Sequence, residues 1–197
     1  MLQASVPSTL HPRHAAIVSG DGAQDDLAGF ARGDEAAIRA VFRAHAPTVA
    51  RVVARLGVSS EDVEDVVQAT FLDAIRVAPG FRGECSMRTW LASIAVNHAR
   101  MLFRGRARAR KSLSLVAASL ETETPLASTL EDDQQTARLR AALARLPELQ
   151  REALVLCELE DLPGKEVAAM LGAPVATIWR RVHDAKVSLR RLLEEDP

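Results

Sequence analysis

Three residues near the end of the chain constrain its fold more than any other feature. Ala168, Gly172 and Ile178 lie at the spacing that a helix-turn-helix requires between its two helices. Ala168 allows the helices to approach closely, Gly172 turns the chain where a side chain would cost energy, and Ile178 fills the angle between them. The second helix of such a pair can enter the major groove of DNA. The segment 162–191 is therefore predicted to bind DNA.

The composition of the chain indicates helices. Its 197 residues include five Phe, two Trp and no Tyr. Ala, Leu and Arg are abundant, and such unbranched or small side chains lose little freedom in a helix. No segment shows the alternation of apolar and polar residues that is typical of a half-buried strand. We therefore expect an all-α fold, and the length allows one ordinary domain or two small ones.

Charge along the chain favours two small helical domains joined by a linker. The net charge is −1, but residues 100–111 carry six bases and no acid, whereas residues 112–136 carry five acids and no base. The acidic segment contains Pro125 and no firm helical period, as expected of a solvated tether. We predict a disordered extension at 1–25, a first domain at 26–111, the acidic linker at 112–136 and a second domain at 137–197.

Boundary residues divide the first domain into three or four helices. Asp34 is suited to cap a helix that begins at Glu35, and Pro47 and Gly57 are expected to bound the next segment. Ser60 opens a further helix whose early acids suit the positive end of its dipole. The pair Pro79 and Gly80 is expected to end that helix.

Several functional classes find no support. Cys85 and Cys157 lie far apart, so we expect neither a zinc site nor a redox motif, and we interpret both as reduced, inert cytoplasmic thiols. Residues 1–24 lack the basic start and apolar run of a secretion signal, and no run is long enough to span a bilayer. No nucleophile motif, glycine-rich phosphate loop or metal-ligand cluster occurs, so we expect no enzyme, metal or cofactor.

The predicted helix 61–78 has two distinct faces. Its apolar stripe includes Val66, Phe71 and Ala74 and should lie in the core. The opposite face is polar and acidic around Leu72, which is either a harmless surface residue or the centre of a protein-docking surface.

The predicted helix 87–104 carries a second stripe beside its apolar one. The buried side is expected to hold Leu91, Ile94, His98, Met101 and Leu102. The other stripe combines an aromatic ring, short polar groups and cations, which suits nucleic acid: Trp90, Ser93, Asn97, Arg100 and Arg104. The alternative is that Trp90 belongs to the core and the arginines form a solvated face.

The predicted last helix, 175–193, is the second helix of the helix-turn-helix. We expect it to bury Val175, Ile178 and Val182, among others. Its opposite side carries groups suited to groove and phosphate contacts: Thr177, Arg180, Arg181, Asp184 and Lys186. Cations on an exposed helix can also serve only solubility, and the helix-turn-helix spacing favours the DNA interpretation.

Three motifs together resemble a known family. They are Glu64–Leu72 (EDVVQATFL), Phe81–Leu91 (FRGECSMRTWL) with Ile94–Asn97 (IAVN), and Leu146–Glu152 (LPELQRE). In this order and with the linker between them, they look like an extracytoplasmic-function (ECF) sigma factor of bacterial RNA polymerase, in the sigma-70 superfamily. The resemblance covers most of both predicted domains.

The resemblance implies a partner for each helix face. The helix 61–78 would dock on core RNA polymerase through Asp65, Gln68 and Leu72. The helix 87–104 and the loop 81–86 would bind the melted minus-ten strand, with a flipped base near the loop. The helix-turn-helix would read the duplex minus-thirty-five element, the acidic linker would thread through polymerase, and an anti-sigma factor would cover the polymerase-binding faces.

Four departures from the family pattern bear on these roles. Ala69 replaces a usual Glu on the docking face. Pro163 and Gly164 replace a usual Ser-aromatic pair at the entrance to the helix-turn-helix. Trp179 stands where Lys is common, and Asp184 where Arg is common.

The rival interpretation is a stand-alone helix-turn-helix transcription regulator that binds operators as a dimer. A receiver domain would show alternating strands and helices with acids at strand ends, and residues 26–111 show neither. The sequence therefore favours an initiation factor that binds core polymerase, directs it to promoters and helps to melt them.

Overall fold

The structure, a computed structural model, describes residues 28–81, 83, 85–116 and 134–195. Within these ranges the regular structure is helical and contains no strand, so the all-α prediction is confirmed. The predicted extension at 1–25, and residues 117–133 of the predicted linker, lie outside the described residues.

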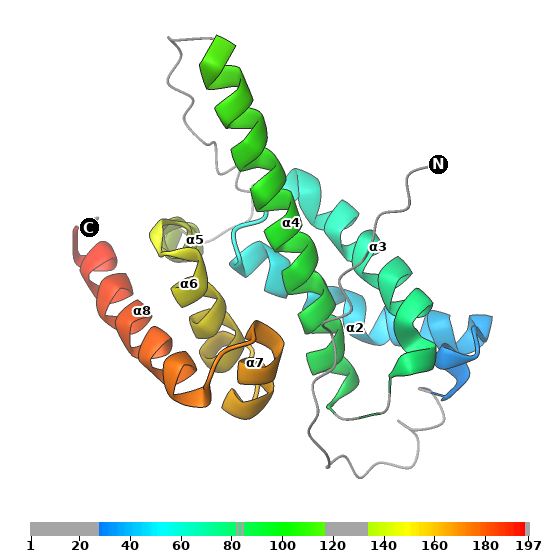
Figure 1. Cartoon of the computed structure of the whole chain (residues 1–197). Coiled ribbons are helices and arrows are strands. Elements are labelled where there is room, and N and C mark those ends of the chain that lie inside the picture. The colour runs from blue at the N-terminus through cyan, green and yellow to red at the C-terminus, as the bar shows by residue number, and fades with distance from the viewer. Residues whose placement is uncertain (1–27, 82, 84, 117–133, 196–197) are drawn as a thin grey trace.

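Three long helices form most of the first domain, after a helical segment at 28–31. They are α2 (Glu35–Arg55), α3 (Ser60–Val77) and α4 (Met87–Val116), and each packs against the other two (Figure 1). The 3-10 turn η1 (Ala78–Gly80) follows α3, where Pro79 and Gly80 were predicted to end it. Valines of α2, Phe71 and Ala74 of α3, and Leu91 and Ala95 of α4 are buried together and form the core of this domain.

The two ends of α2 lie where the sequence predicted them, but the break predicted at Pro47 is absent. The Asp34 side chain accepts a hydrogen bond from the backbone N–H of Ala36 at 2.9 Å, which confirms the predicted cap. Gly57 follows the helix with φ of +94°. The prediction that Pro47 bounds a segment is wrong, because Pro47 lies inside α2. Proline removes one backbone hydrogen bond, but buried valines on both sides of it hold the helix against α3 and α4.

The second domain packs three helices against α8. Its elements are α5 (Gln134–Arg145), α6 (Glu148–Leu154), the π-helical turn η2 (Val155–Leu159), α7 (Gly164–Leu171) and α8 (Val175–Glu195). Helix α8 contacts α5, α6 and α7, and its residues Ile178, Val182 and Ala185 are buried. Figure 1 shows this domain beside the first one, with α6 facing α4.

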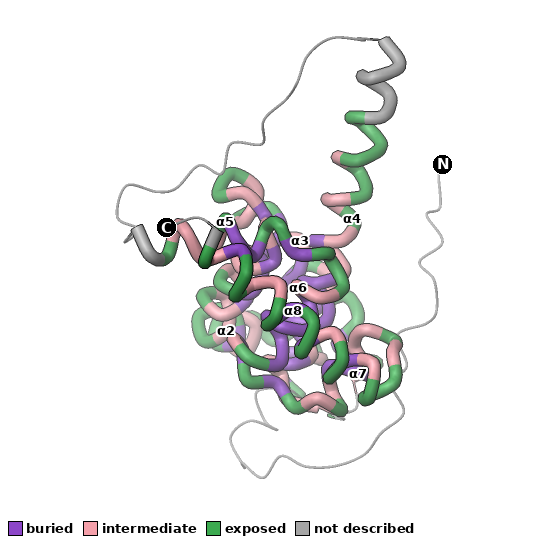
Figure 2. The backbone as a smooth tube through the Cα atoms, turned by 90° about the vertical axis from the view of Figure 1, so that its left-hand side faces the viewer, coloured by how far each residue is buried: buried purple, intermediate pink, exposed green. Residues whose placement is uncertain are grey.

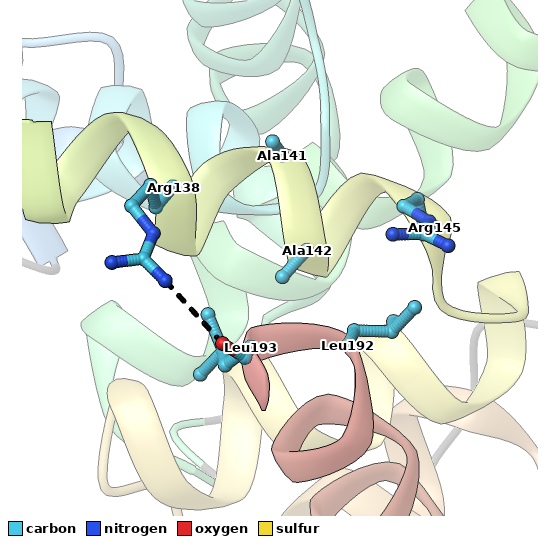
Figure 3. Close-up of a pocket in the computed structure, with 6 residues that line it drawn as sticks. All are labelled: Arg138, Ala141, Ala142, Arg145, Leu192 and Leu193. Carbon is cyan, nitrogen blue, oxygen red and sulfur yellow. Dashed lines mark hydrogen bonds between the residues drawn. The ribbon is translucent and has the colours of Figure 1, made fainter. Parts of the chain in front are cut away.

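Helix α5 covers the end of α8 (Figure 3). Arg138 donates a hydrogen bond to the backbone carbonyl of Leu193 at 3.3 Å. Ala142 and Leu192 line a hollow of about 20 Å³ between the two helices. This volume suits no more than a water molecule, so the contact is a packing contact and not a ligand site.

The predicted helix-turn-helix geometry is confirmed. Ala168 of α7 and Ile178 of α8 are both buried where the two helices meet. Gly172 adopts a left-handed conformation, with φ of +62° and ψ of +37°, and its N–H bonds back to the end of α7. A left-handed residue at this position suits glycine because other residues pay a steric cost there.

Helix α4 is longer than predicted and is buried on a different arc. It continues past Lys111 to Val116, and its C-terminal part projects from the body of the protein (Figure 1). Figure 2 shows most of the residues of α4 just before that part as exposed. The prediction that Met101 is buried is wrong, since Met101 is 53% exposed. The buried arc of α4 centres on Ala95 and Ala99, and at about 100° per residue Met101 points away from that arc.

We predict opposite effects on stability for two glycine substitutions. Gly172→Ala should lower the free energy of unfolding by about 1 kcal/mol, because alanine is strained in the left-handed region. Gly105→Ala, within α4 and with no atom within 4 Å of the added Cβ, should raise it by about 0.5–1 kcal/mol. Denaturation in urea measures both. Equal shifts in the same direction would contradict this account of Gly172.

Candidate polymerase and nucleic-acid interfaces

The predicted docking residues share one exposed face of α3. Asp65, Gln68 and Leu72 are all exposed, and Leu72 is 68% exposed. Opposite them, Val67, Thr70 and Phe71 are buried against the other helices, which fixes the orientation of α3. The structure therefore brings the three residues together as an apolar centre with a polar rim, and their role in docking stays a prediction.

Trp90 takes part in an aromatic cluster at the start of α4. Its ring stacks on Phe81, with centroids 4.4 Å apart and planes at 19°. The Phe30 ring lies nearly perpendicular to it, at 88°, with centroids 6.3 Å apart. Phe30 is fully buried, whereas Trp90 and Phe81 are partly exposed. The sequence left open whether Trp90 is a core residue or a base-stacking ring. In the structure Trp90 packs against buried Phe30 and is itself partly exposed.

The remaining predicted residues of this stripe differ in accessibility. Ser93 is 9% exposed, and its hydroxyl donates to the Trp90 carbonyl at 2.6 Å, so it is engaged within the helix here. Asn97 is partly exposed, and Arg104 is exposed on the projecting part of α4. His98, expected in the core, is only partly buried and contacts Asp73 of α3 at 2.9 Å.

Arg100 of this stripe is joined to the second domain. Its Nε and one terminal nitrogen donate to the two carboxylate oxygens of Glu152, each at 2.6 Å. Glu152 belongs to α6 and is 3% exposed. In this arrangement the buried Glu152 carboxylate therefore occupies the position next to Arg100 that the sequence prediction assigned to nucleic acid.

A second carboxylate joins the domains nearby. Glu160 is 1% exposed and receives hydrogen bonds from Arg51 at 3.0 Å, Arg55 at 2.6 Å and Arg88 at 3.1 Å. It follows η2, where its backbone N–H bonds to the Val155 carbonyl and the next residue turns the chain with a positive φ of 49°. This turn directs the carboxylate toward the first domain.

The arginines control the ionisation of Glu160. Burial by itself would raise its pKa, but hydrogen bonds from Arg51 and Arg88, with the charges of Arg51 and Arg55, outweigh burial and lower the pKa below its usual value. Glu160 is therefore ionised at neutral pH. The sequence prediction missed this site, although Glu152 directly before the apolar run 153–157 and Glu160 directly after Leu159 are a signal of buried charge.

The predicted face of α8 is largely accessible. Arg180 and Asp184 are exposed, and Thr177 and Arg181 are partly exposed. Lys186 is exposed and forms an ion pair with Glu158 of η2 at 2.6 Å. The prediction that Val175 is buried is wrong, since it is 37% exposed at the first position of α8.

Two departures from the family pattern meet in the helix-turn-helix. A Cβ placed on Gly164 would lie 2.7 Å from Cζ2 of the Trp179 ring. Trp179 therefore packs directly over Gly164 while remaining 49% exposed. Glycine at the start of α7 makes room for the Trp179 ring on α8. The departures from the family pattern at Gly164 and Trp179 therefore depend on each other.

The two cysteines were predicted to be reduced and inert. Burial, with the charge of Glu158, raises the pKa of the Cys157 thiol to about 11, so this thiol is protonated and unreactive at neutral pH. Cys85 and Cys157 form no disulfide. No group of side chains suited to a metal ion occurs in the described part of the chain. None of its helices is long and apolar enough to cross a membrane.

Comparisons with known proteins agree with this architecture. Residues 41–109 match the family "Sigma-70 region 2", and residues 136–189 match "Sigma-70, region 4". The chain is 32% identical over 167 residues to the ECF RNA polymerase sigma factor SigM of Mycobacterium tuberculosis H37Rv, covering 85% of this chain and 82% of the relative. It is 34% identical over 167 residues to the ECF RNA polymerase sigma-E factor of Escherichia coli K12, covering 80% and 87%.

A solved structure has the same arrangement of helices. CnrH, in complex with the cytosolic domain of CnrY, aligns with a TM-score of 0.69 at 28% identity, over 90% of this chain and all of that one. The two matched regions define a helical sigma-70-type protein. The chain belongs to the ECF sigma factors of RNA polymerase. It is therefore a promoter-specific transcription initiation factor whose partners are core polymerase and promoter DNA, and not a stand-alone operator-binding regulator.

We predict that Gly164→Ala displaces Trp179. The added methyl group cannot occupy the same space as the indole ring, so the free energy of unfolding should fall by about 1–3 kcal/mol. In a Trp90→Phe background, the emission of Trp179 alone should shift to longer wavelength as the ring becomes more exposed. Gly80→Ala, where the added atom has no neighbour within 4 Å, is the control. An unchanged spectrum would mean that Gly164 does not seat the ring.

Proposed function

We propose that the three helix faces divide the work of initiation. Asp65, Gln68 and Leu72 of α3 dock on core polymerase. Trp90, Ser93, Asn97, Arg100 and Arg104 of α4 hold the melted minus-ten strand. Thr177, Arg180, Arg181, Asp184 and Lys186 of α8 bind the duplex minus-thirty-five element. The chain supplies contacts and no catalytic step, and it acts in the cytoplasm, where its polymerase is found.

One observation carries this proposal: a surface suited to single strands and a duplex reader occur in the same chain. The stacked rings of Phe81 and Trp90 offer an aromatic surface to unpaired bases, and arginines follow them along α4. An unpaired base stacked on an aromatic side chain gains about 1–3 kcal/mol, which duplex bases cannot gain there. A protein that binds operators as duplex DNA has no use for such a surface.

The exposed residues of α8 support duplex binding. Arg180 is exposed in the first half of the helix, where a recognition helix contacts base edges, and its guanidinium can bond guanine in a bidentate manner. Trp179 lies next to Arg180 and is an exposed apolar ring at a position where Lys is common in the family. We infer that this protein gains less from phosphate contacts at that position and more from apolar contacts, such as a thymine methyl group.

A protein partner that silences the sigma factor is part of the proposal. CnrH was solved with the cytosolic domain of CnrY, and this chain shares its arrangement of helices. An anti-sigma factor that covers exposed Leu72 would keep the protein from core polymerase.

Transcription with purified core polymerase on genomic fragments tests the proposal. Specific transcripts should appear only when both proteins are present. Tight binding of defined sites by the protein alone, with no effect on core polymerase, would refute it.

Leu72→Asp should weaken binding to core polymerase by at least about thirtyfold. A charge at the apolar centre of an interface removes a contact of the size of a hot spot, about 2 kcal/mol or more. Fluorescence anisotropy with labelled protein measures the affinity. Met101→Asp, which places the same charge on an exposed apolar residue of α4, is the matched control. Unchanged affinity of the Leu72 variant would disprove the docking face.

Asn97→Ala combined with Arg100→Ala should lower promoter melting at least about tenfold, because the loss of a hydrogen bond that involves a charged group such as the Arg100 guanidinium costs about 1.5–3 kcal/mol. Permanganate reactivity of unpaired thymines measures the melting. Affinity for core polymerase should stay within about twofold, since α3 is untouched. Urea denaturation of the variant controls for the loss of the Arg100–Glu152 pair. A variant that loses polymerase binding as well would contradict the division of faces.

A further inference from the structure

The first two turns of α8 expose apolar side chains on one side. Val175 is 37% exposed, and Trp179, one turn later, is 49% exposed. Residues four apart lie on the same side of a helix, so these two side chains are neighbours. We call them the apolar flank: Val175 and Trp179. It lies beside exposed Arg180, in the N-terminal part of α8, where a recognition helix contacts base edges.

Gly164 determines how the Trp179 ring lies. Helix α7 packs against α8 (Figure 1), and a Cβ on Gly164 would lie 2.7 Å from Cζ2, 3.1 Å from Cε2 and 3.4 Å from Nε1 of Trp179. All three atoms belong to the side of the indole that carries the N–H group. Cε3 and Cζ3 are on the other side of the ring, so the edge farthest from Gly164 consists of carbon alone.

This packing orders the ring before any ligand binds. An exposed side chain ordinarily loses rotamer freedom when it enters an interface, and that loss weakens binding. Trp179 is already held on one side by α7, although about half of it remains exposed. The ring is therefore a preorganised apolar contact on the helix that faces DNA.

Two departures from the family pattern have one combined effect. The usual pattern has an aromatic residue at 164 and Lys at 179, whereas this chain has Gly164 and Trp179. An aromatic side chain at 164 would occupy the space that the Trp179 ring now fills. In this chain the aromatic ring therefore belongs to α8 instead of α7, and the cation on that flank of α8 is absent.

Thymine is the base whose edge suits the apolar flank. In the major groove it presents its C5 methyl group, whereas guanine, adenine and cytosine are distinguished there by hydrogen-bonding groups. The valine methyl groups and the carbon edge of the indole neither donate nor accept hydrogen bonds. They can gain free energy by covering a methyl group, and they offer nothing to a base that presents only polar groups.

We propose that the apolar flank contacts thymine methyl groups in the minus-thirty-five element, and that Gly164 is a positioning residue that holds Trp179 for this contact. The proposal rests on the proposed function in taking α8 as the helix that reads duplex DNA. It goes further in making the thymine methyl group the feature that this flank selects, and in giving Val175 and Gly164 a part in specificity.

The first experiment is a selection by the full chain from DNA duplexes with twelve randomised base pairs. The wild type should enrich thymine at one position or more at least about fourfold over Trp179→Lys, the factor for about 0.8 kcal/mol per buried methyl group. A library made with uracil in place of thymine lacks the methyl group and should abolish this difference.

Val187→Lys is the matched control for the selection. It places the same cation on another exposed apolar residue of α8, outside the apolar flank, and should keep the wild-type preference for thymine. Trp179→Phe retains an apolar ring and should keep part of the preference. A selection in which thymine enrichment does not depend on Trp179, or persists with uracil, would overturn the proposal.

The second experiment tests Gly164 through the ratio of two affinities. A selected duplex is compared with the same duplex carrying uracil at the enriched position, and the wild type should prefer thymine by about fourfold. Gly164→Ala should reduce this ratio to less than about twofold, whereas Gly80→Ala, which has no neighbour within 4 Å of the added atom, should not. Partial unfolding lowers both affinities equally and leaves the ratio unchanged. An unchanged ratio in Gly164→Ala would therefore overturn the positioning role.

Failure of the proposed function has a different signature. The selection would then give the expected dependence on Trp179, while core polymerase gains no promoter-dependent transcription. If transcription occurs and uracil in place of each thymine of the minus-thirty-five element leaves it unchanged, the proposal about the apolar flank fails and the initiation function stands.

Discussion

The arrangement of the two domains depends on one buried carboxylate, that of Glu160. Three arginines from two helices of the first domain hydrogen-bond to it, and their charges keep it ionised although it is almost fully buried. A buried charge is tolerated only with such partners, so the second domain has one favourable position against the first. Glu152 and Arg100 add a second pair and fix the orientation of α6 along α4.

The arginines in these pairs remain partly exposed, whereas the two carboxylates are buried. Ion pairs that are partly open to water contribute modestly to stability. Charge pairing is reversible in a way that the apolar core beneath it is not. The buried apolar residues of the two domains belong to one continuous cluster, so apolar contacts act together with these charge pairs in holding the domains in this arrangement.

Individual residues explain where sequence reasoning succeeded and where it failed. The cap at Asp34, the left-handed Gly172 and the buried Ile178 follow from local chemistry, and the structure has all three. Pro47 and Met101 were misjudged because neighbouring helices decide whether a helix continues and which arc of it is buried. Trp90 was left open between core and surface because its neighbour Phe30 is distant in sequence.

The sequence by itself determined the helices, the helix-turn-helix, the family and the three helix faces, because periodicity, caps and motif order are properties of neighbouring residues. Only the tertiary structure decided what those faces meet. Glu160 pairs with Arg51, Arg55 and Arg88, and Trp179 packs on Gly164. These partners are far apart in the sequence, so the residue types alone do not show which of them meet. Charge and ring pairing depend on distances of a few ångströms, and folding alone sets those distances.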